Sequence, residues 1–94
     1  MRDRPVVLLS RDEAYTKRLS ATIAPITTRK RSIPAEVPVG RDEGLPRPSV
    51  INVDDISTIP LASLDRLLGE ISSKKMREVE EAIRFVLDLP RFAA

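Results

Sequence analysis

The sequence contains no histidine, no cysteine and no tryptophan. Without His and Cys, the chain has no imidazole for acid–base catalysis, no thiol nucleophile and no ordinary zinc site. Any chemistry must therefore use Arg, Lys, Thr, Ser, Tyr or carboxylate groups. We expect neither a metal ion nor an organic cofactor.

Aromatic residues are also scarce. Tyr15, Phe85 and Phe92 are the only ones among 94 residues, although 41% of the chain is hydrophobic, so the core should consist of Val, Ile and Leu. No apolar run approaches the ~20 residues that span a bilayer, and the first such run is too short for a signal-peptide core. We expect a single domain over residues 1–94, located in the cytoplasm and not in a membrane.

Positive charge is concentrated in the first half of the chain. Residues 1–47 contain ten Lys/Arg and six Asp/Glu, a net charge of +4, whereas residues 48–94 contain six and eight, a net charge of −2. The densest basic cluster is Arg29-Lys30-Arg31. Such a region can bind polyanions through counterion release, but a run of charges can equally be a solvated loop.

Hydrophobic patterning predicts a mainly β chain. We expect strands over residues 6–9, 21–28, 35–39 and 49–59, and a short closing strand over residues 68–71. Pro25 removes a ladder donor from the second strand, which should therefore lie at an edge, be bulged, or turn its proline nitrogen away from a partner. A basic hairpin loop should follow over 29–33, and a turn-rich surface loop over 40–48.

The last third of the chain predicts helical structure. Residues 60–67 should form a short helical turn, because proline is tolerated at a first helical position. Ser72 or Ser73 should cap the final helix, and Pro90 follows its end. The apolar residues of this helix recur with helical period and should lie on a sheet; they are Met76, Val79, Ile83, Val86 and Leu87.

Four segments in this order resemble the MazF/PemK family of toxin ribonucleases, from about residue 4 to residue 89. They are Arg4-Pro5-Val6-Val7-Leu8-Leu9-Ser10, Pro25-Ile26-Thr27-Thr28, Val53-Asp54 and the C-terminal helix. The resemblance implies an α+β fold that is mainly β with a C-terminal helix, an SH3-like small β-barrel of the MazF/PemK/CcdB type. It also implies an N-terminally shortened chain, because family members normally begin with a further strand. Without that strand we expect an unpaired edge, an exposed apolar face and a tendency to associate.

The resemblance implies the toxin of a type II toxin–antitoxin system. Such a toxin inhibits growth as a metal-independent, sequence-specific endoribonuclease that cleaves single-stranded mRNA through 2′-hydroxyl attack, and it is a homodimer. Its partner is a MazE-like antitoxin whose acidic tail lies across the RNA groove. One alternative is an inactive, shortened member that binds antitoxin or nucleic acid. Another is a CcdB-like gyrase poison, which is disfavoured because those proteins use a C-terminal tryptophan.

By this resemblance, Arg4 and Thr27 act on the scissile phosphate and Asp54 accepts the 2′-hydroxyl proton. A guanidinium supplies two parallel donors to the charged phosphorane, and a threonine hydroxyl adds a third. Considered without the family, Arg4 could be a solvated flank, and Thr27 and Thr28 could be β-branched strand residues. The basic cluster could be a soluble hairpin tip, and Asp54 and Asp55 could be turn or edge-protecting charges. The expected RNA contacts are Thr28, Arg29, Lys30, Arg31 and Asn52, the last at a position where some relatives have arginine.

Overall fold

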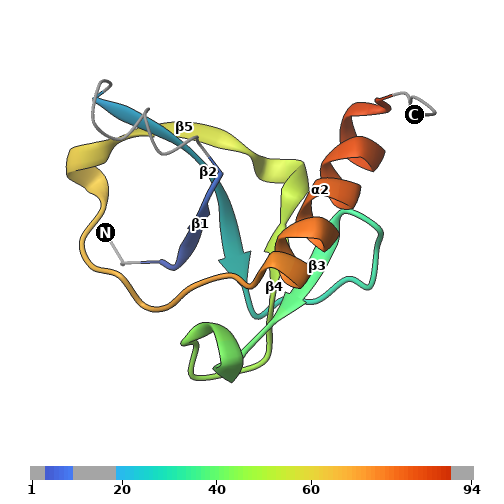
Figure 1. Ribbon diagram of the computed structural model, residues 1–94, viewed down its shortest axis with the longest axis horizontal. Coiled ribbons are helices and arrows are strands. Elements are labelled where there is room, and N and C mark those ends of the chain that lie inside the picture. The colour runs from blue at the N-terminus through green and yellow to red at the C-terminus, as the bar shows by residue number, and fades with distance from the viewer. Residues whose placement is uncertain (1–3, 10–18, 90–94) are drawn as a thin grey trace.

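The computed structural model describes residues 4–9 and 19–89, which form an antiparallel sheet with one long helix on it (Figure 1). The strands are β1 Val6–Leu8, β2 Ser20–Thr27, β3 Glu36–Val39, β4 Ser49–Asn52 and β5 Ser57–Pro60, and the helix is α2 Ser73–Leu87. Three short 3₁₀ helices lie between them: η1 Arg41–Glu43, η2 Val53–Asp55 and η3 Leu61–Ser63. The predicted class, mainly β with a C-terminal helix, is confirmed.

The longest strand, β2, organises the sheet. The strand order is β1-β2-β4-β3, and β5 also pairs with β2, so β2 has three antiparallel partners. Within the described residues the sheet does not close into a barrel, because β1 and β3 remain at its edges. In this part of the chain β1 is an edge strand with one unpaired side, in agreement with the expected unpaired edge.

Pro25 lies in the middle of β2 and still costs the sheet no hydrogen bond. The next residue, Ile26, donates its N–H to the carbonyl oxygen of Pro5 at 3.0 Å. The backbone N–H groups of successive residues in a strand point to opposite sides. Because that of Ile26 points to β1, the nitrogen of Pro25 faces away from β1. On that side, pairing with β5 ends at Ile23 and pairing with β4 begins at Ile26. Pro25 therefore lies opposite the turn between β4 and β5, where no donor is needed.

The prediction of one strand over residues 49–59 is wrong. Strand β4 ends at Asn52, and the side-chain Oδ1 of Asn52 accepts a hydrogen bond from the backbone N–H of Asp54 at 3.1 Å. This local bond competes with the ladder and starts η2, so β5 begins only at Ser57 and pairs with a different part of β2. Asp54 consequently lies in a 3₁₀ turn and not in a strand.

The predicted closing strand over residues 68–71 is also wrong, and the helical turn predicted over 60–67 is limited to η3. A close backbone approach occurs here instead. A Cβ atom on Gly69 would overlap the carbonyl oxygen of Glu43, and one on Gly44 would overlap that of Leu68. The segment is therefore held by contact with the end of η1 and not by a ladder.

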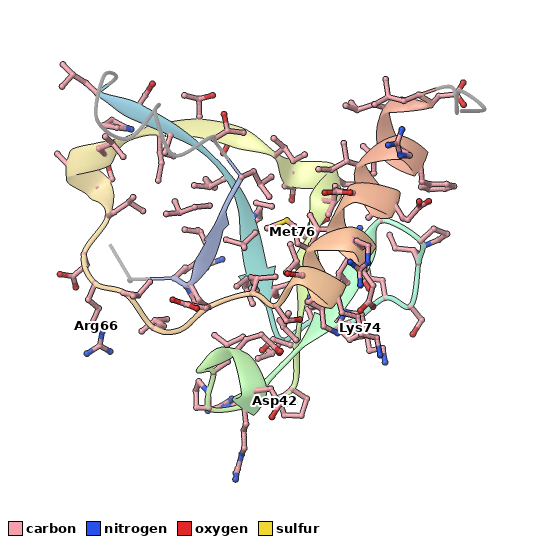
Figure 2. All side chains as sticks on the ribbon, viewed as in Figure 1. Asp42, Arg66, Lys74 and Met76 are labelled. Atoms are coloured by element: carbon pink, nitrogen blue, oxygen red, sulfur yellow. The ribbon has the colours of Figure 1, made fainter. Side chains whose placement is uncertain are left out.

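The core is aliphatic, as predicted. Helix α2 packs on β3 and η2, with Met76 on its sheet-facing side, whereas Arg66 points away from the fold (Figure 2). Ser72 is the N-cap, because its hydroxyl oxygen accepts the Lys75 N–H at 3.0 Å, and Pro90 lies outside the described residues. None of the helices described here is long and apolar enough to cross a membrane. The buried core residues are Val7, Ala24, Val37, Val39, Leu45, Ile51, Val53, Val79 and Ala82.

We expect Gly69→Ala to destabilise the fold by about 1–3 kcal/mol, because the added methyl group must displace backbone of the η1 turn. Gly40→Ala is the matched control, since a Cβ there would meet its nearest atom, the Cα of Pro48, at an ordinary 3.8 Å. Urea denaturation of both variants measures the difference. Equal stability of the two would contradict the close approach of Gly69 to Glu43.

Candidate active site

A cleft of about 320 Å³ opens where β1 begins and β2 ends. Its lining brings together five residues predicted for the site, namely Arg4, Thr27, Arg29, Arg31 and Asn52, with Pro25, Ile26 and Asp55 between them. The other three predicted residues are exposed and do not line the cleft; they are Thr28, Lys30 and Asp54.

Arg4 and Thr27 are brought together by the ladder between β1 and β2. Val6 is paired with Pro25, and continuing this antiparallel register by two residues places Arg4 beside Thr27. The backbone bond from Ile26 to Pro5 fixes the strands at this point. Two residues that are far apart in sequence thus reach the same cleft through backbone pairing alone.

The hydroxyl of Thr27 has a defined orientation. Its Oγ1 accepts a hydrogen bond from the backbone N–H of Arg29 at 3.1 Å. Because a hydroxyl has one proton and two acceptor lone pairs, this bond occupies a lone pair and leaves the proton to donate. Thr27 can therefore present a donor to an anion in the cleft.

Arg31 differs from the other cleft arginines because the protein itself neutralises it. Its Nε donates to Oε2 of Glu36 at 3.0 Å, its Nη2 donates to Oδ1 of Asn52 at 3.3 Å, and Nη2 lies 3.9 Å from Oδ2 of Asp54. Within the described residues, the guanidinium groups of Arg4 and Arg29 have no such partner. The uncompensated positive charge of the cleft thus comes from Arg4 and Arg29.

Glu36 is the residue that sequence reasoning missed. Its side chain is only 3% exposed, and its Oε1 accepts the backbone N–H groups of Arg31 and Ser32 at 2.8 and 3.0 Å. Burial alone would raise the pKa of Glu36, but the hydrogen bonds and charge of Arg31 and the Ser32 N–H outweigh it and lower the pKa. The carboxylate also holds Ser32 in a left-handed conformation, with φ 55°. The one sequence signal was an acidic residue between the buried Ala35 and Val37.

Asn52 connects this network to the cleft. Its Oδ1 accepts from Arg31 and from the backbone of Asp54, so its amide nitrogen is directed to the other side, where Nδ2 donates to Oδ2 of Asp55 at 2.9 Å. Asp54 is half exposed, with 46% of its side chain accessible. Asp55 is exposed as well, but it lines the cleft and Asp54 does not.

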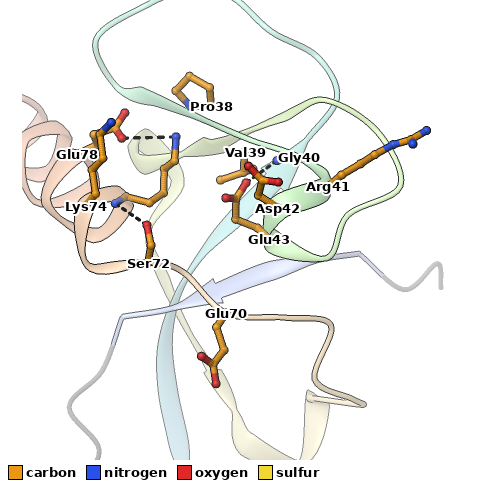
Figure 3. Close-up of a pocket in the computed structure, with 11 residues that line it drawn as sticks. Pro38, Val39, Gly40, Arg41, Asp42, Glu43, Glu70, Ser72, Lys74 and Glu78 are labelled. Carbon is orange, nitrogen blue, oxygen red and sulfur yellow. Dashed lines mark hydrogen bonds and ion pairs between the residues drawn. The ribbon is translucent and has the colours of Figure 1, made fainter.

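A second, larger hollow of about 680 Å³ lies between η1 and the start of α2, away from the predicted residues (Figure 3). Its polar groups hold the fold together. Glu43 accepts the Gly40 N–H at 2.7 Å, Ser72 caps α2, and Lys75 pairs with Glu78 at 3.4 Å. Since these groups stabilise backbone ends and one another, the smaller cleft is the better candidate for chemistry.

The fold and the cleft together define a small α+β protein with a basic, hydroxyl-bearing cleft at the end of its central strand. Comparison with known proteins adds the family. The model of the PemK-like, MazF-like toxins of type II toxin–antitoxin systems matches residues 1–87. The chain belongs to this family.

Several similar proteins come from mycobacteria. Endoribonuclease MazF3 of Mycobacterium tuberculosis is 38% identical over 86 residues, which cover 92% of this chain and 84% of the relative. The solved Mycobacterium tuberculosis toxin MazF-mt6 has a TM-score of 0.90 and 38% identity, covering 94% of this chain and 89% of the toxin. A mycobacterial endoribonuclease in complex with its cognate antitoxin has a TM-score of 0.84 and 27% identity, covering 94% and 84%.

Acid should weaken the fold through Glu36. Because the folded-state pKa lies below the ordinary 4.5, the stability that ionised Glu36 provides is present above pH 4.5 and is lost as the pH falls through the folded value. We expect Glu36→Gln to lower the melting temperature at neutral pH, with a difference from the parent protein that shrinks as the pH falls below 4.5. Thermal unfolding across this range tests it. A constant difference at every pH would contradict the role of the Glu36 charge.

Proposed function

We propose that this protein is the toxin of a type II toxin–antitoxin system and acts as a metal-independent endoribonuclease on single-stranded mRNA. The observation that carries the proposal is the juxtaposition of Arg4 and Thr27 in one basic cleft of a MazF-like fold. The relatives named as endoribonucleases support the same reaction.

The chemistry suits the available side chains. When a ribose 2′-hydroxyl attacks the adjacent phosphate, negative charge develops on the equatorial oxygens of a five-coordinate phosphorus. Arg4 supplies a fixed positive charge with two parallel donors, and the Thr27 hydroxyl proton supplies another. Because arginine stays protonated, it stabilises charge but does not serve as a base.

RNA binding is assigned to the surface that surrounds this pair. Arg29 lines the cleft with an uncompensated guanidinium, and Thr28 and Lys30 are exposed beside it. Arg31 and Asn52 also line the cleft, but their polar groups are already hydrogen-bonded within the protein. They therefore shape the RNA-binding surface more than they bind RNA. The contacts with phosphate therefore come mainly from Arg29 and Lys30.

The proposal extends to partners and location. An antitoxin with an acidic tail fits the uncompensated cations of the cleft, and competition for that charge would inhibit cleavage. A homodimer is supported by large apolar side chains that remain exposed on one chain, among them Phe85 at 61% and Leu67 at 80%. A toxin acting on mRNA works in the bacterial cytoplasm.

We expect Arg4→Ala and Thr27→Ala each to reduce RNA cleavage by about 10²–10³, because each removes a donor to the transition state. Arg4→Lys should also fail, since a point charge does not replace the two-pronged guanidinium. Cleavage rates on a long single-stranded RNA measure the effect. Arg66→Ala and Thr58→Ala, on exposed residues outside the cleft, are the matched controls.

Folding of each variant is checked by circular dichroism, and binding by titration with a 2′-O-methyl RNA that has no 2′-hydroxyl to react. If a folded Arg4→Ala or Thr27→Ala protein cleaves as fast as the controls, the assignment of the cleft as the active site is wrong.

Arg29 and Lys30 are expected to bind phosphates without choosing a sequence. Replacing either with alanine should weaken binding to all single-stranded RNAs and reduce the slope of log K against log salt by roughly 0.7 per lost contact. Titrations at several salt concentrations, with Arg66→Ala as control, measure the slope. An unchanged slope would mean that the loop is a solvated hairpin tip.

A further inference from the structure

We propose that Asp55, held in position by Asn52, is the group that accepts the 2′-hydroxyl proton during RNA cleavage. This inference rests on the proposed endoribonuclease function. It transfers the role of base from Asp54, which the family resemblance suggests, to its neighbour. The reason is the position of the two carboxylates relative to the cleft.

Asp55 is the carboxylate that lines the cleft together with Arg4 and Thr27. The local turn places it there. Asn52 ends β4 and caps η2, and Asp55 is the last residue of that 3₁₀ turn. Asp54, one residue earlier, carries its carboxylate towards Arg31, at 3.9 Å from Nη2, and is not part of the lining.

The two oxygens of Asp55 have different surroundings. Oδ2 accepts the hydrogen bond from Nδ2 of Asn52 at 2.9 Å. Oδ1 has no hydrogen bond or ion pair within the described part of the chain. One oxygen therefore fixes the carboxylate, and the other is available to take a proton from a ligand in the cleft.

The orientation of Asn52 is itself determined by its neighbours. Arg31 and the backbone of Asp54 both donate to Oδ1, which leaves the amide nitrogen for Asp55. Arg31 is in turn held by the carboxylate of Glu36, whose side chain is 3% exposed. A continuous chain of hydrogen bonds thus runs from Glu36 through Arg31 and Asn52 to Asp55, and Asn52 is a positioning residue.

The step balances without any further reactant. The 2′ O–H bond breaks and its proton passes to Oδ1 of Asp55 while the O2′–P bond forms. The P–O5′ bond then breaks, and the departing 5′ oxygen takes a proton from water. Asp55 returns its proton to the solvent. The products are a 2′,3′-cyclic phosphate and a 5′-hydroxyl, with Arg4 and Thr27 stabilising the charge on phosphorus.

The test compares Asp55→Asn, Asp54→Asn and the exposed control Asp65→Asn in RNA cleavage. We expect Asp55→Asn to lower kcat by about 10²–10⁴ while binding of 2′-O-methyl RNA stays unchanged. In Asp55→Gly, added formate or acetate should restore part of the rate, because a small carboxylate can occupy the space and take the proton. Asn52→Ala should lower kcat without raising KM, whereas a lost RNA contact would raise KM.

Each other outcome overturns the inference. If Asp55→Asn cleaves like the control, or if Asp54→Asn shows the loss instead, Asp55 is not the base. If the Asp55→Gly rate is lost but no small carboxylate restores it, Asp55 shapes the cleft and takes no proton. In all these cases a loss of cleavage in Arg4→Ala and Thr27→Ala leaves the proposed function intact. If the parent protein cleaves no RNA, the proposed function fails and this inference fails with it.

Discussion

The missing donor of Pro25 is the constraint around which the sheet and the cleft are arranged. Strands β4 and β5 belong to one run of chain, and both pair with β2, on either side of this proline. Because Pro25 has no N–H, the opposing chain can leave the ladder there without exposing an unsatisfied donor. The turn η2 fills the interval. It brings Asn52 and Asp55 to the same cleft as Thr27.

The cleft contains two kinds of arginine, and the difference decides what each can do. Arg31 is bound to Glu36, Asn52 and Asp54, so its charge is already compensated and it acts as part of the framework. Arg4 and Arg29 carry charge without a partner among the described residues. A preorganised framework with uncompensated cations beside it is what stabilisation of a developing phosphate charge requires.

Much of the fold could be predicted from local sequence. The apolar runs of the first three strands and the helical period after Ser72 reflect burial of one or both faces, which a short window of residues reveals. The strand over residues 49–59 could not be predicted correctly, because the Asn52 side chain competes with the ladder and a residue pattern does not show that competition. The prediction of a strand over residues 68–71 failed for another reason. Its conformation depends on contact between Gly69 and Glu43, which are distant in sequence.

The sequence by itself determined the first three strands, the final helix, the aliphatic core, the absence of imidazole and thiol chemistry, and the motifs that single out Arg4 and Thr27. Only the tertiary structure decided that these two residues meet across an antiparallel register. It also decided that the Glu36 side chain lies against Arg31 with little exposure and that Asp55, instead of Asp54, lines the cleft. The physical reason is that register, burial and the direction of a side chain depend on contacts with residues far away in the chain. Composition and periodicity, in contrast, are present in the sequence itself.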